Sequence, residues 1–311
     1  MLLSIPFGTC QQAIESKATQ LKANVGTPQS GYITDPGFGT IHKNYQWGSI
    51  FCRDVKQGAH AVYGNIWLKW KATPNYGYPI TDELGATDNA GTAVRYSIFS
   101  QNNAIYWTGG TGARTIYGDI YQRWLSLGGV KSQVGFPITD ETSSGTHGGR
   151  YNDFTNGMIY WNSGKSYVHV GPLPTTLTFN WGSINMGDVT GWSTITFSNN
   201  GNARWQSHMH DSKPWPYKWS LAWVLMNADG TSVGLSKHGN VGPNIFGAHD
   251  SNVDQTVNNK EISGNWRAWV AMTQWRARGD TSFAFFKLIE DLFNAIKTIY
   301  PYAAAVITIL A

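Results

Sequence analysis

The sequence predicts a mainly β protein with short helices, in which a repeat array is followed by an antiparallel β-sandwich or small barrel and a C-terminal amphipathic helix. Three observations support this fold class. A seven-residue motif recurs in the first half of the chain. Alternating segments joined by Asn-Gly and Asp-Gly turns fill much of the second half. Apolar residues at helical spacing precede Pro301.

Composition limits the classes of function. The chain has 311 residues, enough for about two domains, and only 14% of them are charged, against about 25% in typical proteins. The net charge of +4 is scattered, so we expect no nucleic-acid partner. Phosphate-binding loops, dinucleotide fingerprints and zinc-type cysteine sets do not occur in the sequence, and we expect no cofactor.

The repeated motif is Gly-Tyr-Pro-Ile-Thr-Asp-Glu at 77–83. It returns as Gly-Phe-Pro-Ile-Thr-Asp-Glu at 135–141 and, degraded, as Gly-Tyr-Ile-Thr-Asp at 31–35. A strand-like segment follows each copy, at 45–51, 99–107 and 154–161. Because three copies occupy the first half, we interpret this half as an array of one repeated unit.

The chemistry of the motif predicts a rigid turn. Gly77 tolerates backbone angles that strain other residues, and Pro79 forces Tyr78 into an extended conformation. Thr81 and Asp82 can accept hydrogen bonds from nearby backbone N–H groups. A catalytic pair of acids would hardly need repeating, which favours turn capping over catalysis for Asp82-Glu83 and Asp140-Glu141.

Each copy is expected to contain a short helix, the Gly-Tyr-Pro turn and a small hairpin. Residues 11–24 have a helix-forming composition, and helical spacing recurs at 67–70 and 121–125. Alternation at Ile105-Tyr106-Trp107 and Ile159-Tyr160-Trp161 suits strands with one buried face.

These linked motifs resemble the LGFP repeat, named for its Leu-Gly-Phe-Pro core. The third copy, with Val134-Gly135-Phe136-Pro137, is the most similar, and the resemblance covers residues 12–173 at a spacing of roughly fifty residues. The family occurs in exported cell-envelope proteins, including the C-terminal part of mycoloyltransferases. The resemblance therefore implies an extracellular or cell-wall location and, as partner, cell-wall polysaccharide or peptidoglycan.

A Gly-Pro-Leu-Pro junction at 171–174 ends the array. The expected organisation is an N-terminal segment (1–11), three repeats within 12–173 (12–66, 67–120 and 121–173), a β-rich domain (174–278), and a C-terminal helix with an apolar tail (279–311).

Aromatic and acidic side chains of the repeats are the candidate ligand-binding residues. Trp107 and Trp161 would offer faces for stacking on sugar rings, Tyr78 and Phe136 would line the turn pocket, and Asp82 and Asp140 would accept hydrogen bonds from sugar hydroxyls. The alternative is that the same aromatics form the core between repeats.

The first copy departs from the pattern, because Cys52 occupies the position of Trp107 and Trp161. Cys10 and Cys52 are the two cysteines of the chain, and they could form one extracellular disulfide or remain two buried thiols. Residues 1–9 lack a basic region and a cleavage site, so they form no convincing signal peptide; the natural beginning is missing or export uses another route.

The second half offers weaker signals. Residues 175–262 alternate like strands of an antiparallel sandwich or barrel. Strand alternation places His208 and His210 on one face beside Asp211, a weak metal candidate, because local spacing fixes no third ligand. Residues 230–234 match the Gly-x-Ser-x-Gly pattern of hydrolases, but in a predicted hairpin instead of a strand–turn–helix.

The end of the chain combines several possibilities. Residues 263–278 could form a helix or a closing strand, and Asp280 could cap an amphipathic helix over 281–299 whose charges exclude a membrane span. The apolar tail at 303–311 packs on its own domain, on a neighbouring subunit or on a membrane surface.

The sequence therefore favours a non-enzymatic, exported cell-envelope protein that binds cell-wall polysaccharide through its repeats. One alternative is a structural subunit of an extracellular filament or sheath that self-associates through 281–299. A second is a cell-wall glycan hydrolase with its active site in the second domain, which would need two opposed carboxylates.

Overall fold

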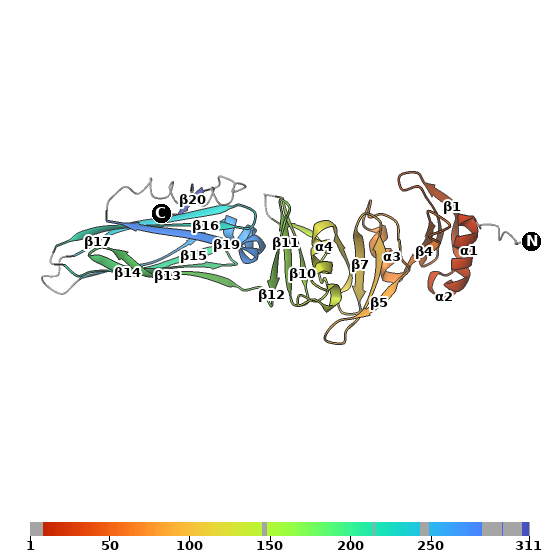
Figure 1. Cartoon of the computed structure of the whole chain (residues 1–311), viewed down its shortest axis with the longest axis horizontal. Coiled ribbons are helices and arrows are strands. Elements are labelled where there is room, and N and C mark those ends of the chain that lie inside the picture. Colours follow the sequence, from red (N-terminus) through yellow and green to blue (C-terminus); the bar gives the residue numbers. More distant parts are fainter. Residues whose placement is uncertain are drawn as a thin grey trace, which may run out of the picture. The chain divides into compact units, whose positions relative to one another are not determined.

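The computed structural model describes residues 9–144, 148–213, 215–242, 249–281, 294 and 307–310. Two compact units make up the chain, Met1–Thr142 with Tyr151–Ile159 and Ser143–Arg150 with Tyr160–Ala311. Strands dominate both, as Figure 1 shows, which confirms the mainly β fold class.

Three four-stranded sheets occur between residues 28 and 170, and in each the strands that follow one another in sequence lie side by side. The first two sheets are antiparallel. The strands are β1 (Pro28–Asp35), β2 (Thr40–Tyr45), β3 (Gly48–Cys52) and β4 (Ala59–Tyr63); β5 (Leu84–Thr87), β6 (Ala93–Phe99), β7 (Asn103–Thr108) and β8 (Gly112–Tyr117); and β9 (Thr142–Ser144), β10 (Gly149–Phe154), β11 (Gly157–Asn162) and β12 (Lys165–Val170).

Short helices accompany these sheets, and they confirm the helical segments expected from the sequence. They are α1 (Cys10–Gln20), α2 (Lys22–Val25), α3 (Gly64–Lys71) and α4 (Gly118–Ser126), with a 3₁₀ turn at Gly129–Lys131. Helix α1 starts with a capping box: the Thr9 hydroxyl accepts from the Gln12 backbone N–H, and the Gln12 side chain accepts from the Thr9 N–H. Ile14 of α1 is fully buried, which holds the helix on its sheet.

The recurring motif makes the turn that its glycine and proline predict. Gly77 has φ +89° and Gly135 has φ +81°. A Cβ at these positions would lie 2.4 Å from Ser100 Oγ and 1.9 Å from Thr155 Oγ1, so a side chain would meet both backbone strain and a clash. Trp70 of α3 and Trp124 of α4 donate their indole N–H to the carbonyls of these two glycines, both at 2.7 Å. Each helix is thereby tied to the motif that follows it.

The expected small hairpin in each copy is an underestimate, because each copy contributes a four-stranded sheet. The additional strands carry weak signals: β5 has the sequence Leu-Gly-Ala-Thr and is only four residues long, and β9 has three residues. Short strands with glycine and serine show little alternation. The central strands with Ile-Tyr-Trp were identified correctly, as β7 and β11, but the expectation of one buried face was wrong, because Ile105 and Tyr106, on opposite faces, are both buried.

The second half forms a sandwich of two four-stranded sheets (Figure 1). Of the two predicted architectures, the sandwich is the one observed. One sheet has the order β13 (Thr176–Met186), β14 (Val189–Ser198), β15 (Asn202–Asp211), β18 (Asp250–Asn258), and the other β19 (Thr273–Asp280), β16 (Tyr217–Asn227), β17 (Ser232–Val241), β20 (Ile307–Leu310). Large side chains from both sheets, among them Trp205, Trp219 and Trp223, share one buried core.

The predicted turns of this half are present. Residues 199–201 join β14 to β15, and 228–231 join β16 to β17. The stretch 263–278, expected as either a helix or a strand, contains both, since α5 (Lys260–Gly264) and α6 (Trp266–Ala271) precede β19. From the apolar tail, β20 pairs in parallel with β17 of the same domain. The expected helix at 281–299 lies outside the described residues, apart from Thr281 and Asn294.

A disulfide joins Cys10, at the start of α1, to Cys52, at the end of β3, across 42 residues of sequence. The bond lies in the core of the first repeat unit with Ile14, Val25 and Ile50. The slot that Trp107 fills in the second sheet is thus used in the first to tie helix to strand.

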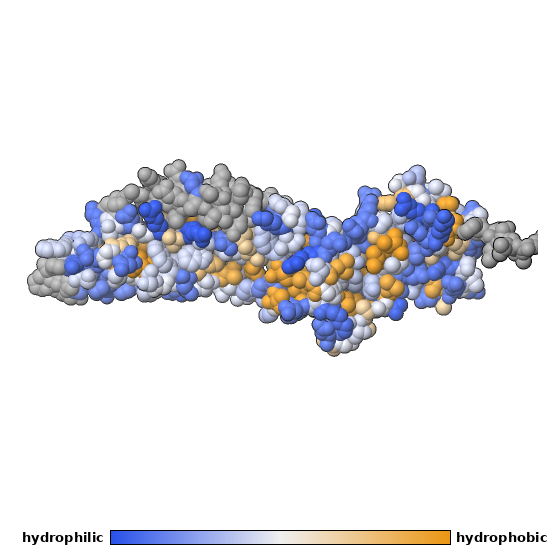
Figure 2. Space-filling view, in the orientation of Figure 1, coloured by the Kyte–Doolittle hydropathy of each residue, from blue (hydrophilic) through white to orange (hydrophobic). Residues whose placement is uncertain are grey.

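The surface seen in Figure 2 shows hydrophobic patches within a largely hydrophilic surround. Leu68 of α3 and Leu125 of α4 are among the exposed large hydrophobic side chains. Among the described helices, none has the length and apolar character that crossing a membrane requires.

Candidate functional site

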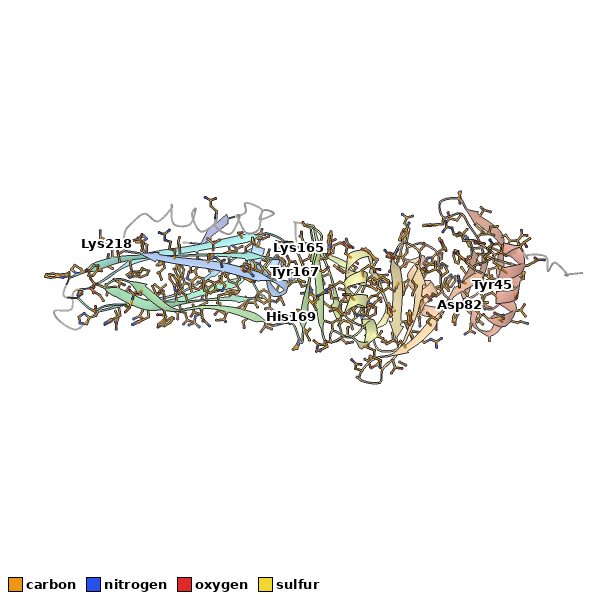
Figure 3. The ribbon with its side chains drawn as sticks, in the orientation of Figure 1. Tyr45, Asp82, Lys165, Tyr167, His169 and Lys218 are labelled. Carbon is orange, nitrogen blue, oxygen red and sulfur yellow. A yellow bond between two sulfur atoms is a disulfide. The ribbon has the colours of Figure 1, made fainter. Side chains whose placement is uncertain are left out.

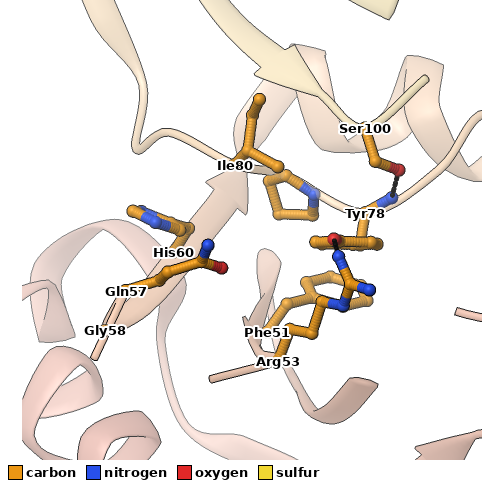
Figure 4. Close-up of a pocket in the computed structure, with 9 residues that line it drawn as sticks. Phe51, Arg53, Gln57, Gly58, His60, Tyr78, Ile80 and Ser100 are labelled. Atoms are coloured by element: carbon orange, nitrogen blue, oxygen red, sulfur yellow. Dashed lines mark hydrogen bonds between the residues drawn. The ribbon is translucent and has the colours of Figure 1, made fainter. Parts of the chain in front are cut away.

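A pocket of about 570 Å³ lies where the motif of the second copy meets the first sheet (Figure 4). Its lining combines apolar and polar groups. It comprises Phe51, Arg53, Gln57, Gly58, His60, Tyr78, Pro79, Ile80 and Ser100. The strand β3, the loop after it and the start of β4 supply one wall, and the Tyr-Pro-Ile segment of the motif supplies the other. Tyr78 thus lies in the lining of a pocket, Phe136 does not line it, and ligand binding by either residue stays a prediction.

Tyr78 is held in place from both sides. Its backbone N–H donates to Ser100 Oγ at 3.2 Å, and its hydroxyl accepts from Arg53 Nη1 at 2.9 Å (Figure 4). The Arg53 guanidinium carbon also lies 5.8 Å from the centre of the Tyr78 ring. Tyr78 is only 9% exposed, so the ring forms a fixed wall of the pocket.

His60 contributes an uncharged polar group. Burial lowers the pKa of His60, while the nearby Asp82 carboxylate acts in the opposite direction and Lys17 adds to the lowering. The imidazole is therefore neutral at pH 7. The buried His60 Nδ1 has no hydrogen-bond partner among the described residues.

The two predicted acids form clasps between successive copies. Asp82, labelled in Figure 3, accepts from the Ala61 N–H of β4 at 2.9 Å and pairs with Lys17 of α1 at 2.6 Å. Both carboxylate oxygens of Asp82 therefore already have donors within the protein. Asp82 thus lies at the contact between the first and second copies, and its role as a sugar contact stays a prediction.

The second clasp repeats the first. Asp140 accepts from the N–H of Thr115 of β8 at 2.9 Å and from its hydroxyl at 3.1 Å, and it pairs with Lys69 of α3. Burial opposes ionisation of Asp140, but the hydrogen bonds from Lys69 and Thr115 outweigh it and hold the pKa below its ordinary value.

The copy expected at 31–35 is wrong in register, because Pro28 pairs with Tyr45 as Pro79 pairs with Phe99, so the first motif begins at Gly26 and Gly31 stands at the place of Asp82. Asp35 lies instead at the β1–β2 turn, where it accepts from the Gly37 N–H at 3.0 Å.

The predicted aromatics are not gathered at one site. Phe136 is 4% exposed and belongs to the interior, whereas Trp107 and Trp161 are half-buried. Trp107 lines two shallow hollows beside α3, one with Glu83 and one with Lys69. Of the predicted aromatics, Tyr78 is the one that lines the large pocket.

The weak metal candidates do not converge. His208 and His210 lie on the outer face of β15, where they are bonded to Asn252 and Asp250, both at 2.8 Å. Asp211 is fully buried on the opposite face. Within the described ranges, no group of three or more His, Cys, Asp or Glu side chains is placed to hold a metal ion.

The hydrolase-like pattern at 230–234 lies in the turn before β17 and in that strand, as the hairpin predicted. Ser232 is fully buried, and its hydroxyl donates to the Gly230 carbonyl at 3.5 Å. The strand–turn–helix that exposes a nucleophilic serine is not formed here.

The last residue of the third motif predicts a pH dependence of stability. Burial, with a smaller contribution from Asp119, raises the pKa of Glu141 from 4.5 to about 8. A carboxyl whose pKa is raised by folding stabilises the fold fully below its unfolded value, and that stability is lost as pH rises through the folded value. We expect the melting temperature to fall between pH 4.5 and about 8, and to fall less steeply in Glu141→Gln.

Thermal unfolding at a series of pH values checks this expectation. Glu83→Gln is the matched control at the same place in the second motif, because Glu83 already accepts from Arg95 Nε at 2.7 Å. This control should lower the melting temperature through the lost ion pair and leave the slope with pH unchanged. Equal slopes in Glu141→Gln and the unchanged protein would contradict the assignment.

Sequence reasoning missed the first-sheet half of the pocket. Phe51, Arg53, Gln57 and His60 lie in the copy that departs most from the repeat pattern. One signal was available, because Arg53 follows Cys52 at the place where the second copy has Thr108.

Comparison with known protein families identifies the repeats and no other part of the chain. Residues 77–132 and 134–172 match the sequence profile of the LGFP repeat. A comparison with curated proteins gives no significant match. Among solved structures, one similar chain is the crystal structure of the WD40 domain of SCAP from fission yeast, at 8% identity and a TM-score of 0.14, with 82% of this chain and 64% of that chain covered. This chain thus spans less than two thirds of that one, and a TM-score this low carries no argument about the fold.

The profile match includes the two motif turns and the two acids of the clasps, Asp82 and Asp140. LGFP repeats are associated with the cell wall, which suggests an extracellular or cell-wall location for a protein that contains them. The chain therefore carries LGFP repeats at 77–132 and 134–172 and is a cell-wall-associated repeat protein.

Proposed function

We propose that this protein binds cell-wall polysaccharide, without catalysing a reaction, and that the pocket between β3 and the second motif is its principal sugar site. The observation that carries the proposal is the pocket itself. It has a volume of about 570 Å³, within the usual range for small-molecule sites, and it lies beside an LGFP motif.

The lining has the chemistry that a sugar unit requires. A pyranose presents apolar C–H faces and hydroxyl groups at its edge. Phe51 and the fixed ring of Tyr78 supply an apolar surface, and Arg53, Gln57 and Ser100 supply polar groups around it. Because Tyr78 is held by Ser100 and Arg53, little side-chain entropy is lost when a ligand binds against its ring.

Co-sedimentation of the full chain with insoluble cell-wall material tests this function. Gln57→Trp would fill the pocket from its exposed rim, and we expect it to weaken wall binding about tenfold, a loss of about 1.4 kcal/mol. The matched control is Val55→Trp, which adds the same ring to the same loop outside the pocket and should leave binding unchanged.

Three results would count against the proposal. Absence of co-sedimentation would contradict wall binding. Equal binding by both tryptophan variants and the unchanged protein would contradict the assignment of the pocket as the binding site. Release of soluble sugar from the same wall material would instead support the hydrolase alternative.

A further inference from the structure

Arg53 places at the pocket a guanidinium group that donates one hydrogen bond within the described part of the protein. Its Nη1 donates to the Tyr78 hydroxyl at 2.9 Å, and the described part of the chain shows no other hydrogen bond of this side chain. The Tyr78 hydroxyl accepts this bond, so its own proton remains available to a ligand. Figure 4 shows the guanidinium beside the Tyr78 ring, with Phe51 next to both.

The charge of the pocket is positive. Among the lining residues, all of them in the described part of the chain, Arg53 is the only one with a permanent charge. Burial lowers the pKa of His60 and keeps its ring neutral. The Asp82 carboxylate, which acts on the pKa of His60 from outside the lining, is paired with Lys17 at 2.6 Å. A negative ligand would therefore find an attractive group and no opposing carboxylate in the lining.

One wall of the pocket recurs at the second junction between copies, but the arginine does not. The motif wall is repeated, since Phe136-Pro137-Ile138 corresponds to Tyr78-Pro79-Ile80. The place of Arg53, directly after the Cys52 or Trp107 slot, is held by Thr108 in the second sheet. The cation is thus a feature of one junction and not a requirement of the repeat fold.

We infer that the pocket selects a sugar unit that carries a negative charge, a carboxylate or a phosphate, which the free edge of the Arg53 guanidinium binds while the sugar ring packs on Tyr78. The inference rests on the proposed function and specifies its ligand class. Guanidinium groups form paired N–H···O bonds with either anion, so the shared chemistry is that of an oxyanion attached to a sugar.

Paired probes that differ only in charge test the inference on the full chain by calorimetric titration. An oligogalacturonide and its methyl ester form the carboxylate pair, and glucose 6-phosphate and glucose form the phosphate pair. We expect the unchanged protein to bind at least one charged probe about tenfold more tightly than its neutral partner. The pair that shows the preference identifies the source of the charge.

Variants locate the effect. Arg53→Gln should remove the preference, so that the charged probe and its neutral partner bind equally, and Arg53→Lys should retain part of the preference. Arg123→Gln removes an equal charge from the exposed side chain of Arg123 in α4, which does not line the pocket, and should keep the preference. Arg53 is itself exposed, and equal melting temperatures of the two glutamine variants would show that folding is intact.

The outcomes separate this inference from the function on which it rests. Equal affinity for charged and neutral probes overturns the charge selection while wall binding stands. A preference that survives in Arg53→Gln also overturns it, since the charge is then read elsewhere. Binding of no probe, together with absence of wall co-sedimentation, overturns both.

Discussion

Replacing both cysteines, as Cys10→Ala with Cys52→Ala, is expected to lower the free energy of unfolding by about 4 kcal/mol. The disulfide closes a loop across 42 residues. Closing a loop of that length lowers the conformational entropy of the unfolded chain and so raises its free energy by about 4 kcal/mol. The bond also ties α1 to β3, the strand that leads into the pocket-lining loop. Alanine is preferred to serine because Cys52 is 1% exposed and a hydroxyl there would be buried.

Urea unfolding of the oxidised protein and the double variant measures this difference. The unchanged protein in a reducing buffer is the control and should unfold like the variant. A free-thiol count of zero in the native oxidised protein should accompany the result. Two free thiols, or a difference under about 1 kcal/mol, would show that the bond does not hold the first unit together.

The second large effect is expected at the clasp between the second and third copies. Asp140→Ala removes the acceptor for the Thr115 N–H and hydroxyl and the partner of Lys69. Thr115 is 4% exposed, so its N–H is left buried without an acceptor. Hydrogen bonds to a charged acceptor contribute about 1.5 to 3 kcal/mol each, and we expect a loss of about 3 kcal/mol in the free energy of unfolding.

An acid that serves only its own turn supplies the control. Asp35→Ala alters a carboxylate at the β1–β2 turn that accepts from the Gly37 N–H, and it should cost less than about 1 kcal/mol. Asp140→Asn retains an oxygen for Thr115 and should fall between the two. Equal losses in Asp35→Ala and Asp140→Ala would mean that the acid serves its own turn and not the contact between copies.

The fold could be predicted where the residue type restricts the backbone to few conformations. Gly77 and Pro79 leave little choice of backbone, and the Ile-Tyr-Trp segments were identified as strands, although both faces of these strands are buried and not one. The strands β5 and β9 could not be predicted, because they are held by pairing with the neighbouring strand and not by their own side chains.

The candidate site was predictable only in half. Tyr78 was identified because it belongs to the repeated motif, whereas Arg53 and His60 come from the preceding copy, and the pocket exists only where the two copies meet. The role of Asp82 was likewise predicted only in part, because it depends on a neighbouring copy. Its recurrence indicated a structural role, but single-copy reasoning assigned that role to its own turn, and its partners Lys17 and Ala61 lie in the copy before it.

The most direct test of polysaccharide binding at the first junction is hydrogen–deuterium exchange of the full chain with and without solubilised cell-wall polysaccharide. If the pocket is the binding site, exchange should slow in two segments, the loop and strand at 53–60 and the motif at 77–83, which together form its walls. Slower exchange confined to the sandwich, at 176–280, or unchanged exchange in both segments under saturating polysaccharide, would contradict the account.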